Sequence, residues 1–242
     1  MPTKISRLVR APRLWAPFLL AVPFMLAAGA AFAAPVLSYT ATDEGTAMPP
    51  AGEVLQTYTP PTTGTAPITF SNGTTVTFSN PLATAYPAMS VNGTVLNQYA
   101  APINSSGAAE TSNYYSAGLG DVTIQFATPQ TYLGLLWGSV DLGNELYFYS
   151  NGTLVGEITG GDFDPGANGN QAFGGSYFIN ADVTGGSFNE VVATSTFVSF
   201  ELANLEAGST PPSSVPDPSS AALLGSALIA CGIIRRRSGK KL

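Results

Sequence analysis

Three oxygen-bearing side chains lie in a glycine-rich stretch at residues 161–170, where the residue types come closest to a metal site. Asp162, Asp164 and Asn168 are spaced along Gly-Asp-Phe-Asp-Pro-Gly-Ala-Asn-Gly-Asn. Carboxylate and amide oxygens are the ligands that calcium prefers. Pro165 and the lack of a closing glutamate depart from an EF-hand loop. The stretch predicts either a calcium site or a solvated loop in which Asp, Asn and Gly form turns, and we favour the solvated loop.

Trp137 is the candidate for binding a sugar, since flat aromatic rings stack on the apolar faces of sugars and β-sandwiches often serve as carbohydrate modules. It precedes Gly138-Ser139, and Tyr147-Phe148-Tyr149 follows it along the chain. Side chains alternate along a strand, so Tyr147 and Tyr149 are expected on one face and Phe148 on the other. That arrangement suits a half-buried sheet. Core packing is therefore the favoured role, and an aromatic platform for sugars is the alternative.

Carboxylates are the only side chains of the central region that could catalyse hydrolysis. The chain has no histidine, and its nine lysines and arginines all lie before residue 14 or after residue 234. Bases and nucleophiles near neutral pH are usually His, Cys or Lys. Acid pairs such as Glu145 with Glu157, or Asp162 with Asp164, could serve glycoside hydrolysis. In so acidic a region such pairs also arise by chance, so we predict no catalytic residue and a protein that is not an enzyme.

The missing bases also limit the partners and cofactors. Nucleic-acid binding uses Lys and Arg against phosphate, so nucleic acid is excluded as an expected partner. Zinc, haem and iron–sulfur sites depend largely on His or Cys, and the one cysteine, Cys231, lies in an apolar run near the end of the chain. We therefore expect no cofactor, with calcium as the one metal that the residue types allow.

The central region predicts an all-β fold. Short runs rich in Val, Ile, Thr, Phe and Tyr recur between turn residues, and no long run has the spacing of an amphipathic helix. Asn-Gly pairs at 72–73, 92–93 and 151–152 favour tight hairpins. Many short strands with regular turns are typical of a β-sandwich or jelly roll. The expected strands are 68–70, 76–78, 122–126, 132–137, 145–149, 154–158, 177–179, 191–193 and 197–202.

The first 33 residues predict a secretory signal peptide. A basic segment is followed by an apolar stretch and small residues, and Ala31-Phe32-Ala33 predicts cleavage before Ala34. The alternative is an uncleaved membrane anchor. We expect export through the general secretion machinery, with signal peptidase as a partner, and a β-sandwich domain over residues 34–210.

The last residues carry a linker at 211–214 and a sorting or anchor segment at 215–242. Val215-Pro216-Asp217-Pro218 precedes an apolar run at 221–234, and Arg235, Arg236 and Arg237 close it. The run predicts a short hydrophobic helix that anchors the chain in the membrane, with the arginines on the cytoplasmic side. Together these features resemble the PEP-CTERM sorting signal of exosortase-processed bacterial surface proteins. Asp217 stands where that signal has Glu. An ordinary tail anchor is the alternative.

The strands at 132–149 also carry a resemblance. Tyr-Leu-Gly-Leu-Leu-Trp-Gly-Ser-Val-Asp at 132–141 and Glu-Leu-Tyr-Phe-Tyr at 145–149 are similar to strands of one exosortase-dependent surface protein family. That family often ends on Phe-Glu-x-Asp-Asn, whereas Phe200-Glu201-Leu202-Ala203-Asn204 lacks the aspartate. The resemblance implies a β-sandwich and a surface destination.

These features predict an exported, non-catalytic protein of the cell surface or extracellular matrix, sorted by an exosortase-type enzyme and anchored by its C-terminus. We expect the protein, with its many uncharged polar side chains, to lie within extracellular polysaccharide. The alternative function is a carbohydrate- or calcium-dependent binding module.

Overall fold

The computed structural model describes residues 34–51, 53–80 and 86–209. These residues form an all-β domain with one short helix. The elements, in chain order, are β1 (Val36–Asp43), β2 (Val54–Thr57), β3 (Ile68–Thr69), β4 (Thr75–Ser79), β5 (Met89–Val91), β6 (Tyr114–Ser116), β7 (Asp121–Gln130), β8 (Tyr132–Gly138), β9 (Asn144–Ser150), β10 (Thr153–Thr159), α1 (Gly160–Phe163), β11 (Tyr177–Thr184), β12 (Phe188–Ser195) and β13 (Glu201–Ser209).

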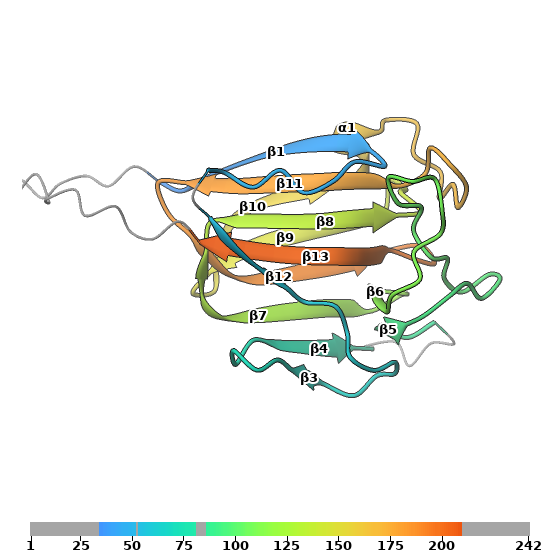
Figure 1. The fold of residues 1–242 in the computed structure, drawn as a ribbon, viewed down its shortest axis with the longest axis horizontal. Helices are drawn as coiled ribbons and strands as arrows, with labels where there is room; N and C mark the ends of the chain where they lie inside the picture. Colours follow the sequence, from blue (N-terminus) through green and yellow to red (C-terminus); the bar gives the residue numbers. More distant parts are fainter. Residues whose placement is uncertain (1–33, 52, 81–85, 210–242) are drawn as a thin grey trace, which may run out of the picture. The chain divides into compact units, whose positions relative to one another are not determined.

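The strands form two antiparallel sheets. Sheet A runs in the order β1-β11-β8-β13-β6-β5, and β2 also pairs with β13. Sheet B runs in the order β10-β9-β12-β7-β4-β3. Figure 1 shows β8, β11 and β13 of sheet A in front of β9, β10 and β12 of sheet B. The all-β prediction is confirmed, while the flanking signal peptide and C-terminal helix lie outside the described residues.

The main core fills the space between the two sheets. Period-two alternation sends every second side chain of a strand inward. In β8 these residues are Leu133, Leu135 and Trp137, and in β9 they include Leu146 and Phe148. Most of this cluster is completely buried. The core therefore joins strands of both sheets, and burial of this apolar surface is the main force that holds them together.

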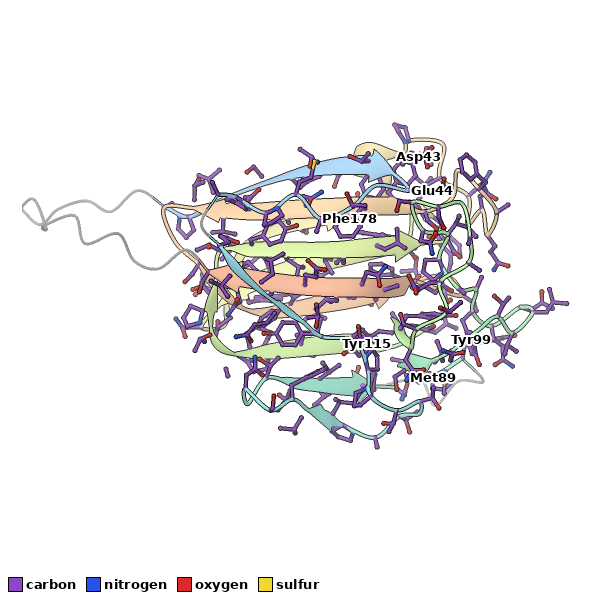
Figure 2. The ribbon with its side chains drawn as sticks, in the orientation of Figure 1. Asp43, Glu44, Met89, Tyr99, Tyr115 and Phe178 are labelled. Atoms are coloured by element: carbon purple, nitrogen blue, oxygen red, sulfur yellow. The ribbon has the colours of Figure 1, made fainter. Side chains whose placement is uncertain are left out.

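A second apolar layer lies on the outer face of sheet A, under the segments that connect the strands. It contains Leu136 of β8, Phe178 of β11 and Tyr114 of β6, with Met89 and Tyr99 packed against it. Figure 2 shows Phe178 on this face, with Met89 and Tyr99 toward the β5 edge. Because β8 is covered on both faces, all of its residues are buried. That explains why its sequence is a continuous apolar run without alternation.

The domain begins and ends at the same end of sheet A. Val36 of β1 pairs with Thr184 of β11. Two residues away, Asp182 pairs with Tyr132 of β8, and Tyr132 also pairs with Gly208 of β13. We call this end of the strands the terminal end. Residues 34–36 and 207–209 therefore emerge at the same end of sheet A, with β11 and β8 between them.

The last residues of β1 and the first residues of β13 lie at the opposite end of the strands. We call this the distal end. Trp137 pairs there with Tyr177 and with Leu202. Asp43 and Glu44 lie at this end of β1 in Figure 2. The segments 139–143, 160–176 and 196–200 connect strands here. The distal end therefore gathers loops that are far apart in the sequence.

Candidate functional site

The distal end carries a pocket with a volume of about 410 Å³. Its walls come from the β8–β9 connection, the glycine-rich segment after α1 and the β12–β13 connection. The lining residues are Asp141, Leu142, Ala167, Asn168, Gly169, Phe197 and Val198. The size falls within the 300–1,000 Å³ typical of small-molecule sites.

Asp141 supplies the carboxylate of the pocket and is only 8% exposed. Its Oδ1 atom accepts a hydrogen bond from the Gly143 backbone N–H at 2.7 Å. Burial raises the pKa of this carboxyl group, and backbone N–H groups of Gly143 and Asn144 partly oppose that effect. The Oδ2 atom lies on the side of Gly169, 3.9 Å from where a Cβ atom would stand on that glycine. One oxygen is thus fixed by the turn while the other lies beside a wall of the pocket.

Two large apolar side chains, Leu142 and Phe197, stand at this pocket, and each is 56% exposed. The Phe197 ring packs over Gly143, where an added Cβ would come within 2.4 Å of the ring. The Ser195 hydroxyl donates to Asn144 Oδ1 at 2.7 Å and accepts from the Phe197 N–H at 3.1 Å. These bonds hold the backbone at Phe197 close to the start of β9.

Asp162 and Asp164 accept hydrogen bonds from nearby backbone N–H groups. Asp162 Oδ2 accepts a hydrogen bond from the Thr159 N–H at 2.7 Å, which forms half of a capping box at the start of α1. Asp164 Oδ1 accepts from the Gly166 N–H at 3.0 Å. Both carboxylates therefore have the turn and cap roles expected of a solvated loop.

Asn168 is the third predicted calcium ligand and lies at the pocket wall. Its backbone forms an isolated β-bridge with Asp141, and its side chain is exposed. Across the described part of the chain, no group of three or more Asp, Glu, His or Cys side chains is placed to hold a metal ion. Calcium binding at Asp162, Asp164 and Asn168 stays the alternative hypothesis to the solvated loop that we favour.

We expect calcium to leave the melting temperature of the protein unchanged, because both aspartates already accept backbone hydrogen bonds. Thermal unfolding in millimolar calcium and in excess chelator measures this directly, since a bound ion stabilises the folded state by mass action. A rise with calcium that is lost in the Asp164→Asn variant would instead assign the loop to the ion.

Trp137 is completely buried, which contradicts its candidate role in sugar stacking. One face of its ring stacks on Phe200 at 4.2 Å between ring centroids, and Phe163 of α1 meets it edge-on at 5.2 Å. A sugar has no access to either face. The favoured interpretation, core packing, holds for Trp137 and for the fully buried Phe148.

Tyr147 and Tyr149 lie on the outer face of sheet B, opposite to Phe148, as the alternation predicted. Their rings are 6.4 Å apart and inclined by 34°. The Tyr147 hydroxyl donates to Glu145 Oε2 at 2.5 Å, and this bond is the largest cause that raises the pKa of Tyr147 to about 12. The predicted acid pair Glu145 and Glu157 therefore flanks a tyrosine on an outer sheet face.

Glu201 is a completely buried carboxylate that the sequence did not single out as a site. Its Oε1 atom accepts hydrogen bonds from the Ala100 N–H at 3.0 Å and from the Ser199 hydroxyl. Its Oε2 atom is buried without a hydrogen-bond partner. Burial raises the pKa of Glu201, although the hydroxyls of Ser199 and Ser139 and the Ala100 N–H favour the ionised form.

The sequence did not identify the pocket, because Asp141, Asn168 and Phe197 come from three separate connections. One local signal was present in Asp141-Leu142-Gly143. A single large apolar residue within a polar turn indicates an exposed apolar side chain. Phe197 was predicted to lie in a strand over 197–202, but β13 begins at Glu201. Phe197 is left in the loop, where its ring is exposed.

The predicted export and sorting residues fall almost wholly outside the described residues. Ala34 is the first residue described, whereas Ala31, Ala33, the motif Val215-Pro216-Asp217-Pro218 and the cluster Arg235-Arg236-Arg237 lie outside. Within the described ranges, no helix is both long enough and apolar enough to span a membrane.

Comparisons with known proteins gave little likeness. No family model matches the chain, and no curated protein matches it. Among solved structures, the crystal structure of the enzymatically active domain of bacteriophage CBA120 tailspike protein 4 is similar at 12% identity and a TM-score of 0.21. The match covers 65% of this chain and 19% of the tailspike chain.

Proposed function

We propose that the protein is an exported, non-catalytic β-sandwich domain of the cell surface or extracellular matrix, tethered through its C-terminal segment. The observation that best supports this proposal is that residues 34–36 and 207–209 both lie at the terminal end of sheet A. A membrane tether after residue 209 would hold this end toward the membrane. The distal end and its pocket would then face outward.

The charge of the domain supports an extracellular, matrix-exposed role. Residues 34–209 contain no Lys, Arg or His, and every acidic residue of the chain except Asp217 lies among them. Such a surface repels other acidic polymers and phosphate. Hydration by uncharged polar side chains suits a module surrounded by neutral polysaccharide.

The carboxylates support a non-catalytic role. Asp162 and Asp164 hold backbone N–H groups, and Glu201 is sealed in the outer apolar layer. Glu145 and Glu157 flank Tyr147 on a sheet face, whereas small-molecule substrates are usually held in concave pockets. Asp141 is the one acid at the distal pocket, and acid–base hydrolysis of glycosides uses two.

The sorting segment supplies the experiment. Replacing Pro216 and Pro218 with alanine is expected to retain the protein in the membrane fraction with its C-terminus uncut, because an exosortase-type enzyme would no longer find its motif. Fractionation followed by immunoblotting of epitope-tagged protein measures the shift. The double variant Ser219→Ala, Ser220→Ala is the matched control and should sort normally. Equal surface release of all three proteins would reject sorting through this motif.

Binding of neutral glycans is the second candidate function, favoured by the tilted pair Tyr147 and Tyr149 on the outer face of sheet B. Aromatic side chains on a sheet face can stack on apolar sugar faces. Replacing both with alanine is expected to abolish any glycan-array signal, with the exposed Phe173→Ala variant as the control. An array without signal for the unchanged protein would remove this candidate.

A further inference from the structure

The distal pocket combines one desolvated carboxylate with an apolar wall. Asp141 stands among Leu142, Ala167, Phe197 and Val198. An anionic group beside apolar side chains attracts a charge of opposite sign on an apolar body, because each part of such a ligand then meets a matching surface.

The described part of the chain supplies no positive charge that could complement Asp141. Residues 34–209 contain no Lys, Arg or His, so no described side chain can form an ion pair with Asp141. Its carboxylate accepts hydrogen bonds from backbone N–H groups at the 141–144 turn. The exposed ring of Phe197 adds a second attraction, since cations favour the faces of aromatic rings.

The pocket is also pre-formed. Thr196 N–H donates to the Gly143 carbonyl at 3.0 Å, and Gly169 N–H donates to the Val140 carbonyl at 2.8 Å. Gly160 allows close approach to Asp141, where an added Cβ would lie 2.0 Å from the Asp141 carbonyl oxygen. The three loops are therefore tied together, so a ligand would lose little free energy in ordering them.

We propose that the distal pocket binds an organic cation, an ammonium group carried on an apolar stem, with its charge at Asp141 and its stem between Leu142 and Phe197. A free amine and a lysine side chain of a partner protein share this chemistry. The site goes beyond the proposed surface function and does not depend on how the chain is sorted. At the distal end it would face away from the tether.

The experiment is a calorimetric titration of the purified full-length protein with 2-phenylethylammonium. The isosteric neutral probe is 2-phenylethanol, and a short lysine-containing peptide represents a protein source. We expect saturable binding of the ammonium probe and weak or no binding of the alcohol. Saturable binding of the peptide but not of the amine would assign the cation to a partner protein.

Two variants and two matched controls locate the site. Asp141→Asn keeps an acceptor for the Gly143 N–H but removes the charge, and it should weaken binding by about 10- to 100-fold. Phe197→Ala should weaken it by about 3- to 5-fold. Glu157→Gln and Phe173→Ala remove an exposed carboxylate and an exposed ring elsewhere, and they should leave the affinity unchanged.

Three results would overturn the proposal. These are the absence of saturable binding by both cationic probes, equal affinities for the amine and the alcohol, and equal losses in Asp141→Asn and Glu157→Gln. Equal losses would show that the acidic surface as a whole, and not Asp141, attracts the ammonium probe. Thermal unfolding of each variant without ligand distinguishes a lost contact from a lost fold.

Discussion

Replacing Trp137 with alanine is expected to lower the free energy of unfolding by about 3–5 kcal/mol, the usual cost of deleting a large buried aromatic side chain. Trp137 is completely buried, stacks on Phe200 and meets Phe163 of α1. The deletion would leave a cavity between β8, Phe163 of α1 and Phe200, which directly precedes β13. Urea unfolding followed by circular dichroism gives the free energy of unfolding.

The Trp137→Phe variant is the control for this prediction. It keeps a ring against Phe200 and removes the indole Nε1–H, which is buried without a hydrogen-bond partner. A clearly smaller loss than in the alanine variant is expected. If Trp137 instead lay on a surface used for sugars, the alanine variant would change stability by only about 0.5 kcal/mol.

The second large effect concerns Glu201. Replacing it with glutamine is expected to raise the melting temperature at about pH 8 and to change it little at about pH 5. Burial raises the pKa of Glu201 in the folded state above its ordinary value of 4.5. The stability that the protonated form provides is complete below pH 4.5 and is lost as the pH rises through the folded-state pKa. Glutamine stays neutral, so it avoids this loss.

The size of the change in melting temperature depends on how much more tightly Glu201 binds its proton in the folded state than in the unfolded state. Each tenfold difference in proton affinity between the folded and unfolded states is worth about 1.4 kcal/mol, and each 1 kcal/mol moves the melting temperature of a domain this size by about 2–4 °C. The Ala100 N–H and the Ser199 hydroxyl, which bond to Oε1, can bond equally to the glutamine oxygen. The new amide group would occupy the place of the unpartnered Oε2 atom.

Melting curves across the pH range test the Glu201 prediction, with the exposed Glu157→Gln variant as the control. Burial also raises the pKa values of Asp141, Asp182 and Glu206, so some loss of stability toward alkaline pH should remain in Glu201→Gln. Hydrogen bonds lower the pKa of Glu110, which acts in the opposite direction. Parallel curves for Glu201→Gln and the unchanged protein would contradict the assignment.

Strands with a clear local pattern could be predicted from the sequence. The runs that became β7 to β12 alternate or are continuously apolar, and the Asn151-Gly152 turn between β9 and β10 has positive φ angles of 49° and 79°, as an Asn-Gly hairpin requires. In contrast, β1, β2, β5 and β6 were not predicted. β5 and β6 have three residues each, too few to show a period. In β1 half-buried residues alternate with exposed ones, so its pattern was present in the sequence and the prediction missed it.

The candidate site could be predicted only in part, for a physical reason. Asp162, Asp164 and Asn168 were chosen because they are close in sequence, but local spacing could not show that the first two would hold backbone N–H groups. The pocket depends on the pairing of β8, β9, β12 and β13, which places residues near 141, 168 and 197 at one end of the domain. No local pattern of residues contains that information.

The most direct test of the central proposal is mass spectrometry of the mature protein isolated from its native cell envelope. Export and sorting predict an N-terminus at Ala34 and a C-terminus near Pro216, with the β-sandwich domain intact between them. Peptides that retain the segment before Ala34, together with an intact Arg235-Arg236-Arg237 cluster, would contradict the proposal that the domain is exported and sorted by an exosortase-type enzyme.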